Sequence, residues 1–478
     1  MVSRSSSGRW TTAIAAAAVL AAALPGLGAL ALGPILPGQS VAAAATALPE
    51  RQGGGRRGGR GGIGVTFFGL ADTGKDGTLT RAELRETLEH WATAWDRTGS
   101  GTLTPEQVRA GALTAFPPPT QNQTPNPAHV EAMRAALPER APATPRSARR
   151  VLVLARATGF VHQTIPLAAR TVEELGRRTG AWSTVITYDA ADINAASLSQ
   201  VDAVFLASTT GHFLDDAVSP AATAARRQAF LDFVRSGKGI AGVHAASDSY
   251  HTGTQTAEAG AGPGMGVARA LLARDTDRDG RLSRTEVSAA AGAWFDRVDP
   301  GRTGSVGPAE FAERFTTLLD ESAPARDGRG GPVNAGTWPE WNRMIGGAFL
   351  AHPWQQVWVK IDDPSSPITA PFNGAPFEIR DETYTFTRES FSRDNVRVLL
   401  SIDVSKMTPD DLKRENRPWD HDYALSWVRA EGRGRLFYSA HGHEPAIYAN
   451  RQMLEHYLAG IQYALGDLEA EDRTAPAR

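Results

Sequence analysis

The segment SGKGIAGVHAASDSY, residues 236–250, predicts a buried strand followed by a sharp turn. Residues 240–243 form a short apolar run next to glycine, which is typical of a strand covered on both faces. Similar apolar runs occur at residues 151–154, 185–188 and 203–207. Because helical segments alternate with these runs, the sequence predicts an α/β fold with a parallel sheet and right-handed crossovers.

Two helices of this alternating region have recognisable ends. Thr164 begins one helix and Gly180 ends it, while Ser219 begins a second helix that ends at Gly237. In parallel sheets, ligands bind beyond the carboxyl ends of the strands. The residues expected at those ends are Gly159, Phe160, His162, Thr209, Thr210, Gly211, His244 and Asp248.

The second half of the chain predicts further strands and a closing helix. The strands are expected at residues 356–362, 377–386 and 396–402, and as a pair within 424–438, with the helix at 451–465.

Seven segments of the chain, taken in order, resemble the trehalose-utilisation (ThuA-like) family. They are ATGFVHQTIP, LASTTGHFLDD, SGKGIAGVHAASDSY, WPEWNRMIGGAFLAHPWQQ, DETYTF, DHDYALSW and YSAHGHE. The resemblance covers residues 149–250 and 333–468. It implies the flavodoxin-like sheet of class I glutamine amidotransferases and a role in carbohydrate metabolism.

The resemblance also implies what the domain does not do. In class I amidotransferases the strand that corresponds to residues 240–243 leads into a turn that carries a nucleophilic cysteine. This chain has His244 at that position and contains no cysteine. We therefore do not expect glutaminase activity, and the absence of cysteine also excludes disulfides, Cys-ligated zinc and iron–sulfur clusters.

Histidine and carboxylate residues are frequent in the segments that resemble the family. A histidine with a carboxylate can perform acid–base chemistry on a sugar, whereas two or three histidines can hold a transition metal. No short spacing such as HExxH fixes a metal site in this sequence. The candidate catalytic residues are His244, Asp248, Glu382, His162 and His443.

Two other segments match the template of the EF-hand calcium loop. Residues 72–83 have acidic residues at positions 1 and 5, Gly77 at position 6 and Glu83 at position 12, and residues 275–286 match better because position 3 is acidic as well. Calcium prefers six to eight oxygen ligands, which such loops supply. The expected ligands are Asp72, Asp76, Thr78, Glu83, Asp275, Asp277, Asp279, Arg281 through its carbonyl, and Glu286.

Each of these loops is followed, 24 residues later, by a weaker copy that begins at Asp96 or Asp299. The same offset in two places predicts two EF-hand-like pairs, at residues 66–116 and 251–332, the second inserted in the α/β domain. Within each pair we expect the two loops to face each other, Leu79 against Leu103 and Leu282 against Val306. The weaker candidate ligands are Asp96, Thr98, Ser100, Asp299, Thr303 and Glu310.

The beginning of the chain has the layout of a secretory signal. Arg4 and Arg9 precede a long apolar run that ends in small residues around Ala45-Thr46-Ala47. The alternative is an uncleaved membrane anchor, but three prolines interrupt the run. We expect residues 1–47 to be a signal peptide, 48–65 and 117–148 to be linkers and 469–478 a tail, in a periplasmic or secreted protein with no stable membrane insertion after cleavage.

The composition is that of a globular protein. Hydrophobic residues make up 41% of the chain and charged residues 21%, and the net charge is −2. Nucleic acid is therefore not an expected partner. Two functions fit the sequence: an exported, calcium-stabilised enzyme acting on a sugar or sugar derivative, or a carbohydrate-binding protein without catalysis on the same scaffold. Clustered histidines and carboxylates would favour the enzyme, and aromatic residues exposed along a groove would favour the binding protein.

Overall fold

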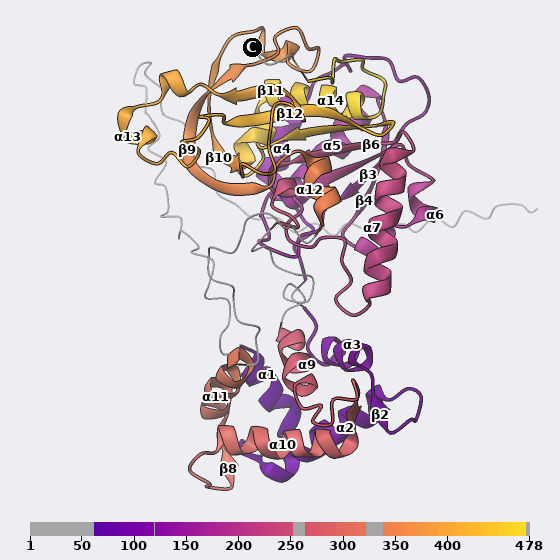
Figure 1. The fold of residues 1–478 in the computed structure, drawn as a ribbon, viewed down its shortest axis with the longest axis vertical. Coiled ribbons are helices and arrows are strands. Elements are labelled where there is room, and N and C mark those ends of the chain that lie inside the picture. The colour runs from indigo at the N-terminus through magenta and orange to yellow at the C-terminus, as the bar shows by residue number, and fades with distance from the viewer. Residues whose placement is uncertain (1–61, 119, 252–262, 322–337, 475–478) are drawn as a thin grey trace, which may run out of the picture. The chain divides into compact units, whose positions relative to one another are not determined.

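The structure is a computed structural model that describes residues 62–118, 120–251, 263–321 and 338–474 (Figure 1). The expected signal peptide, residues 1–47, lies outside the described residues. The described residues form two separate hydrophobic cores, one in an α/β domain and one in a helical lobe. The lobe comprises residues 62–116 and 263–321.

A nine-stranded sheet forms the centre of the α/β domain. Its parallel half consists of β3 (Arg150–Leu154), β4 (Ser183–Thr187), β5 (Ala203–Ala207), β6 (Gly239–Val243) and β13 (Gly434–Ser439). These strands lie in the spatial order β4-β3-β5-β6-β13, which is the order of flavodoxin-like sheets. The predicted α/β fold with a parallel sheet is confirmed.

Four antiparallel strands extend the sheet beyond β13. They are β12 (Ala424–Glu431), β11 (Arg397–Ile402), β9 (Phe349–Ile361) and β10 (Phe377–Phe386). β12 and β13 form the hairpin that the sequence predicts, whereas β9 begins earlier than expected.

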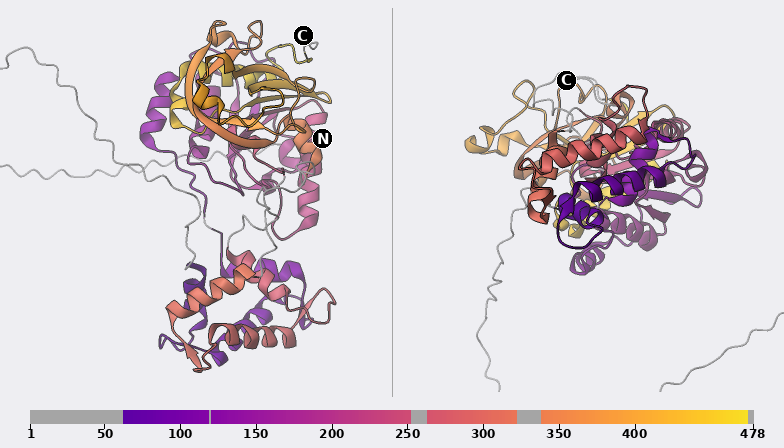
Figure 2. Two further views of the ribbon diagram at one scale, coloured as in Figure 1. Left: turned by 60° about the vertical axis from the view of Figure 1, so that its left-hand side comes forward. Right: turned by 90° about the horizontal axis from the view of Figure 1, so that it is seen from below.

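Helices cover both faces of the sheet (Figures 1 and 2). Successive residues of β13 point to opposite faces. Phe437 lies against Gly460 of α14 (Arg451–Ala464), and on the opposite face Gly434 lies close to Val234 of α7 (Pro220–Arg235). The other helices of this domain are α4 (Pro127–Ala136), α5 (Ile165–Thr179), α6 (Ala195–Leu198), α12 (Pro339–Ile345) and α13 (Pro409–Leu412).

The helical lobe contains both EF-hand-like segments. Its helices are α1 (Gly62–Ala71), α2 (Arg81–Trp95), α3 (Pro105–Ala115), α9 (Pro263–Leu272), α10 (Arg284–Val298) and α11 (Pro308–Glu321). The short strands are β1 (Leu79–Thr80), β2 (Thr102–Leu103), β7 (Leu282–Ser283) and β8 (Ser305–Val306). One helix joins the two loops of each segment, α2 in the first and α10 in the second.

The pairing of the four loops differs from the expectation. β1 pairs with β8, with Leu79 opposite Val306, and β2 pairs with β7, with Leu103 opposite Leu282. The prediction that the two loops within each segment face each other is therefore wrong. The loops pair between the two segments, which are far apart in the sequence.

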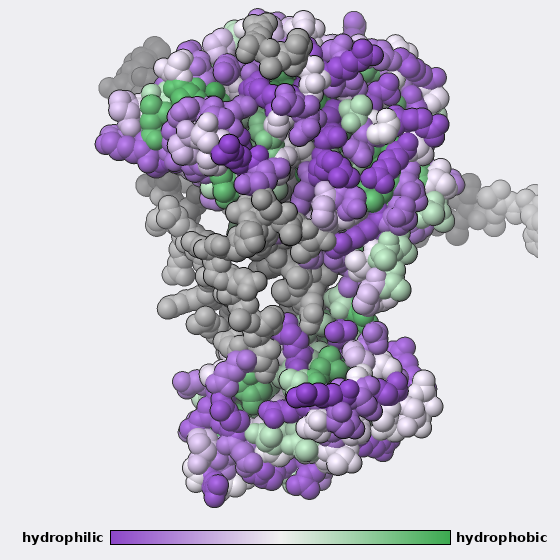
Figure 3. All heavy atoms as spheres, viewed as in Figure 1, coloured by the Kyte–Doolittle hydropathy of each residue, from purple (hydrophilic) through white to green (hydrophobic). Residues whose placement is uncertain are grey.

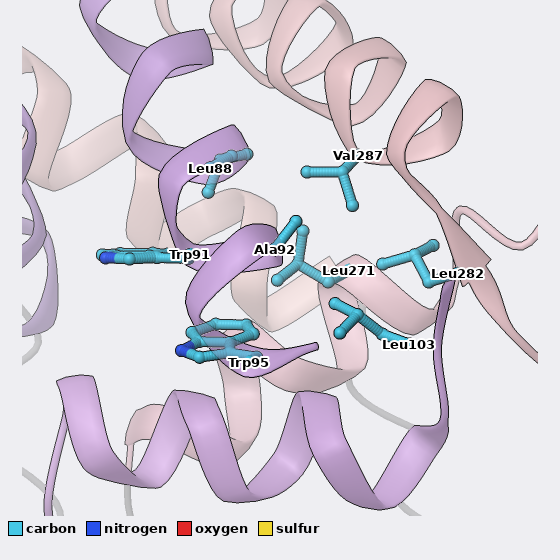
Figure 4. A pocket seen from close by; sticks show the side chains of 8 residues that line it. All are labelled: Leu88, Trp91, Ala92, Trp95, Leu103, Leu271, Leu282 and Val287. Carbon is cyan, nitrogen blue, oxygen red and sulfur yellow. The ribbon is translucent and has the colours of Figure 1, made fainter. Parts of the chain in front are cut away.

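One shared core explains this exchange of partners. α1 packs on α11, α2 on α10, and α3 on α9, so every helix of the first segment has a partner in the second. Figure 4 shows side chains of α2 and β2 facing those of α9, β7 and α10 around an apolar pocket. The lining residues are Leu88, Trp91, Ala92, Trp95, Leu103, Leu271, Leu282 and Val287.

One helix begins in an expected linker and another lies wholly inside one, since α1 overlaps the linker 48–65 only at residues 62–65. α1 begins at Gly62, and its Phe67 is fully buried among Phe116, Phe311 and Phe315. α4 lies within residues 117–148 and contributes Met133 to the core of the α/β domain. The described helices include none that is long and apolar enough to cross a membrane. Figure 3 shows polar side chains over most of the visible face.

Candidate functional site

Three histidines follow the carboxyl ends of parallel strands. His162 lies in the loop after β3, His244 directly follows β6, and His443 lies in the loop after β13. Because these strands run in the same direction, their ends meet at one edge of the sheet. The structure therefore brings together histidines that are far apart in the sequence.

The turn at His244 is held in an uncommon backbone conformation. Its φ angle is +45°, in the left-handed region that non-glycine residues rarely adopt. Such a conformation costs of order 1–3 kcal/mol and needs support from its surroundings. The buried hydroxyl of Tyr438 donates a hydrogen bond of 2.7 Å to the carbonyl of His244, and Ser247 lies 2.7 Å from the same hydroxyl.

The ring of His244 has a defined orientation. Its Nδ1 lies 3.0 Å from the carbonyl oxygen of Ala440, which can only accept a hydrogen bond. Nδ1 therefore carries the proton, and in the neutral ring Nε2 presents a lone pair. The ring of Tyr384 packs against the imidazole, with the centroids 4.3 Å apart.

Glu382 reaches the histidines because of an irregularity in β10. Arg380 pairs with Gln356 and Thr383 with Trp354, so β10 has one more residue than β9 between these pairs. Such a bulge alters the alternation of side chains along a strand. Asp381 and Glu382 both contact the loop that carries His443, whereas neighbours in a regular strand point to opposite faces.

Asp381 positions the loop that carries His443. One carboxylate oxygen accepts a hydrogen bond from the backbone N–H of Gly442 at 2.7 Å, and the other accepts one from Glu444 at 2.8 Å. Burial raises the pKa of Asp381 to about 6. Electrostatic interaction with His244 and the two hydrogen bonds limit this rise. Asp381 is a positioning residue, since it holds the residues on either side of His443.

The cluster consists of His162, His244, Glu382 and His443, each with one donor atom within 4.8 Å of the others. Nε2 of His244 lies 3.2 Å from Nε2 of His162 and 3.5 Å from Oε2 of Glu382. Nδ1 of His443 lies 3.1 Å from the same Oε2. The other oxygen of Glu382, Oε1, lies 3.2 Å from Nδ1 of His352.

The pKa values of the residues in the cluster are shifted in different directions. Burial lowers the pKa of His162 well below its ordinary value, and the nearby His244 and His443 add to this effect. Interaction with Glu382 raises the pKa of His443, against the effect of burial. Burial alone would raise the pKa of Glu382, but its interactions with His244 and His443 hold that pKa far below the ordinary range. The site therefore contains an ionised carboxylate among imidazoles.

The structure places four of the five candidate catalytic residues together. Asp248 is the exception, since its carboxylate lies 2.6 Å from Nε2 of His251 and outside the cluster. Asp381 and His352 also lie beside the cluster, although neither was among the five candidate catalytic residues. Both lie in segments that resemble the family, DETYTF and WPEWNRMIGGAFLAHPWQQ, which was the available signal.

The loops at residues 72–83 and 275–286, which match the calcium template better than the other two, share one feature. In each, one oxygen of the first aspartate accepts the N–H of the glycine at position 6, Asp72 from Gly77 and Asp275 from Gly280. The other oxygen, Oδ1, is buried and has no hydrogen-bond partner among the described residues. Such an oxygen is costly to bury unless something binds it.

The glutamates at position 12 fold back over these loops. Glu83 accepts the N–H of Gly74 at 2.9 Å, and Glu286 accepts the N–H of Thr276 at 2.7 Å. The backbone hydrogen bond from Ser283 lowers the pKa of Glu286 to about 2. Carboxylate oxygens of Asp275, Asp277 and Glu286 lie within 4.8 Å of one another.

In the two weaker loops, N–H and O–H groups of the same loop donate hydrogen bonds to the first aspartate. The oxygens of Asp96 accept hydrogen bonds from Thr98, Ser100 and Gly101, and those of Asp299 accept from Thr303 and Gly304. Glu310 lies 3.4 Å from Arg314 on its own helix. In both loops, protein donors therefore contact the two oxygens of the first aspartate.

The fold and the site define a flavodoxin-like α/β domain with a histidine–carboxylate cluster at the carboxyl edge of its sheet. The family described as "ThuA: Trehalose utilisation" matches residues 150–274 and 329–464, more than half of the chain. The chain belongs to this family.

Two solved structures are similar to the chain. One is a ThuA-like protein of Bacteroides uniformis ATCC 8492, with 15% identity, a TM-score of 0.38, and coverage of 69% of this chain and 96% of that one. The other is a ThuA-like protein of Parabacteroides merdae ATCC 43184, with 14% identity, a TM-score of 0.37, and coverage of 68% and 93%. Among curated proteins, none matches the chain.

Proposed function

We propose that the α/β domain is an enzyme that acts on a sugar or sugar derivative in carbohydrate utilisation. The observation that carries this proposal is the convergence of His162, His244, His443 and Glu382 at the carboxyl edge of the sheet. Membership of the trehalose-utilisation family supports the substrate class. A cluster of this kind can bind and polarise the hydroxyl or carbonyl oxygens of a sugar.

The distribution of aromatic residues favours the enzyme over the binding protein. Six large aromatic side chains of the α/β domain that could stack on a sugar are buried: Trp338, Trp341, Trp354, Tyr384, Tyr423 and Trp427. Trp419 is 40% exposed. Phe160 is 56% exposed, and its ring contacts His162 edge-on with the centroids 4.7 Å apart. Phe160 is therefore placed to stack on a sugar bound at the cluster.

The test is a screen for turnover of trehalose, other disaccharides, monosaccharides and their oxidised or phosphorylated derivatives. We expect Glu382→Gln to lower kcat/KM for the best substrate by about 100-fold or more, as loss of a group that acts on the reacting atoms does. His421→Ala is the matched control, because His421 pairs with Glu415 outside the cluster. Binding without turnover of any compound would favour the binding protein, and equal rates for Glu382→Gln and wild type would disprove the assignment of the site.

We also propose that the loops at residues 72–83 and 275–286 bind calcium. The buried, unpartnered Oδ1 atoms of Asp72 and Asp275 support these two sites, and the satisfied aspartates of the weaker loops argue against the other two. Extracellular loops of this kind bind calcium with dissociation constants of about 10⁻⁴–10⁻³ M. Calcium at about 100 times the dissociation constant stabilises a folded protein by about 2.7 kcal/mol per site.

Thermal unfolding of the full chain with calcium and with chelator tests the calcium proposal. Asp72→Ala and Asp275→Ala should each remove part of the calcium-dependent stabilisation. Asp96→Ala should destabilise the protein to the same extent in both conditions, because its oxygens are occupied by protein N–H and O–H groups. A wild-type protein whose unfolding temperature is the same in both conditions would contradict the proposal.

Export of the protein is a third proposal. It rests on the signal layout of residues 1–47 and on the calcium loops, since calcium outside the cell is abundant enough to fill such sites. We expect mass spectrometry of the mature protein to find an N-terminus near Leu48. Secreted material that retains residues 1–47 would contradict cleavage.

A further inference from the structure

We propose that His162, His244, His443 and Glu382 bind one divalent transition-metal ion of the zinc type. This inference extends the proposed function. The role of the ion rests on that function, whereas the binding of the ion does not. Three imidazole nitrogens and one carboxylate oxygen converge there, and this donor set suits first-row transition metals rather than calcium or magnesium.

The spacing of the donor atoms fits a single ion. Two ligands at about 2.0–2.1 Å from zinc, at the tetrahedral angle, are about 3.3 Å apart. Nε2 of His244 lies 3.2 Å from Nε2 of His162 and 3.5 Å from Oε2 of Glu382. Nδ1 of His443 lies 3.1 Å from that oxygen. These three separations are close to the edges of one coordination shell, and the other three are no longer than 4.8 Å.

The position of the ring proton of His244 supports the same conclusion. The carbonyl of Ala440 fixes the proton of His244 on Nδ1, so that Nε2 directs its lone pair toward the cluster. A metal-binding histidine usually donates its remote ring N–H to a carbonyl or carboxylate, as His244 does here. Nε2 of His162 faces this lone pair, while Nδ1 of His162 is buried without a hydrogen-bond partner among the described residues.

The residues around the four donors are arranged as a supporting shell. Asp381 binds the N–H groups of Gly442 and Glu444 and so fixes the loop of His443. His352 contacts Oε1 of Glu382, which leaves Oε2 directed toward the nitrogens. His162 and His244 are buried, whereas Glu382 and His443 are partly exposed, so the cluster reaches solvent at these two residues. A bound ion would supply Lewis-acid polarisation of a sugar oxygen.

The experiment is a titration of the full chain with Co²⁺ and with Zn²⁺ in excess calcium, which keeps the calcium loops filled. Visible absorption reports the coordination of Co²⁺, calorimetry gives the affinity for Zn²⁺, and elemental analysis gives the stoichiometry. We expect one ion per wild-type chain. Glu382→Gln and His443→Ala should weaken binding by more than about 100-fold, which exceeds the about 10–100-fold typical of supporting residues.

Two control variants calibrate this effect. His352→Ala removes a supporting contact and should weaken binding by about 10-fold, while His421→Ala removes a histidine outside the cluster and should leave binding unchanged. Circular dichroism checks that each variant is folded. The proposal is overturned if the wild type binds no stoichiometric ion, or if Glu382→Gln and His443→Ala, when folded, bind as the wild type does.

The same titration separates this inference from the proposed function. If the ion binds and no sugar is turned over, the metal site stands and the proposed function fails. If the metal-free protein turns over a sugar at the full rate and takes up no ion, the proposed function stands and the metal site is disproved. A chelator that prefers transition metals to calcium prepares the metal-free protein.

Discussion

Leu79 of β1 lies opposite Val306 of β8 in an antiparallel pair that joins two distant parts of the chain. The second pair, Leu103 opposite Leu282, joins the same two parts. Each pair couples one better-charged loop to one weaker loop. Calcium bound in either charged loop should therefore stabilise a strand that belongs to the other segment.

Hydrogen exchange can test this coupling. In saturating calcium, Asp275→Ala should speed exchange of the β2 amides at Thr102–Leu103 more than exchange of the β1 amides, because β2 pairs with the strand of the altered loop. Asp72→Ala should act instead on β8 at Ser305–Val306. Exchange rates that rise equally in all four strands would show that the lobe opens only as a whole.

Two glycines of α1 offer a test of the packing in the lobe. A Cβ at Gly64 would lie 2.4 Å from Cα of Ala312 on α11, while a Cβ at Gly69 would have nothing within 4 Å. We expect Gly64→Ala to destabilise the lobe by about 1–3 kcal/mol through overpacking. Gly69→Ala should stabilise it by up to about 1 kcal/mol, because alanine favours helix.

Unfolding in denaturant, followed by tryptophan fluorescence, measures both changes. If Gly64→Ala is as stable as Gly69→Ala, α1 does not pack closely on α11.

The buried ring of His456 should lower the free energy of unfolding in acid. Its Nδ1 lies 2.9 Å from the carbonyl of Ile368 and its Nε2 2.9 Å from the hydroxyl of Ser426. Burial lowers its pKa from the ordinary 6.5 to about 4. The neutral form is favoured on folding, so the stabilisation is complete above pH 6.5 and is lost as the pH falls through 4.

The size of this effect follows from the two pKa values. They differ by about 2.5, and at about 1.4 kcal/mol for each pKa unit the loss is about 3 kcal/mol. The free energy of unfolding of wild type minus that of His456→Gln should fall by this amount between about pH 7 and pH 4. A constant difference for His456→Gln would contradict the prediction.

The exposed ring of Phe160 should contribute to substrate affinity. Stacking of an aromatic ring contributes about 0.5–1.5 kcal/mol beyond burial, so Phe160→Ala should raise KM by about 2- to 10-fold with a smaller change in kcat. Val161→Ala is the control, since Val161 is a neighbouring side chain that is also exposed. Steady-state kinetics on the best substrate of the screen compare the two. Equal KM values would remove Phe160 from the substrate site.

The sequence predicted the parallel sheet well because the evidence for it is local. The apolar runs that became β3, β5 and β6 are short and continuous, and buried parallel strands have this pattern. The rule that ligands bind at the carboxyl ends of such strands then identified His162 and His244 as neighbours. Both residues lie in the cluster.

Other features depend on contacts that no local pattern specifies. Alternation along a strand predicts opposite faces for Asp381 and Glu382, and the bulge in β10 that changes this has no signal in the sequence. The four loop strands have the same kind of apolar residue at the paired position, for instance Leu79 and Leu103. Their partners are therefore decided by the packing of the helices in a shared core.

The exchange of partners in the helical lobe has a consequence for proteolysis. Residues 62–116 and 263–321 behave as two complementary fragments, joined by helix packing and two short ladders. A single protease cut between Ala115 and Pro127 should therefore not release the N-terminal fragment, which would stay associated until the protein is denatured. Expressed as two separate polypeptides divided at that point, the chain should reassemble from its pieces.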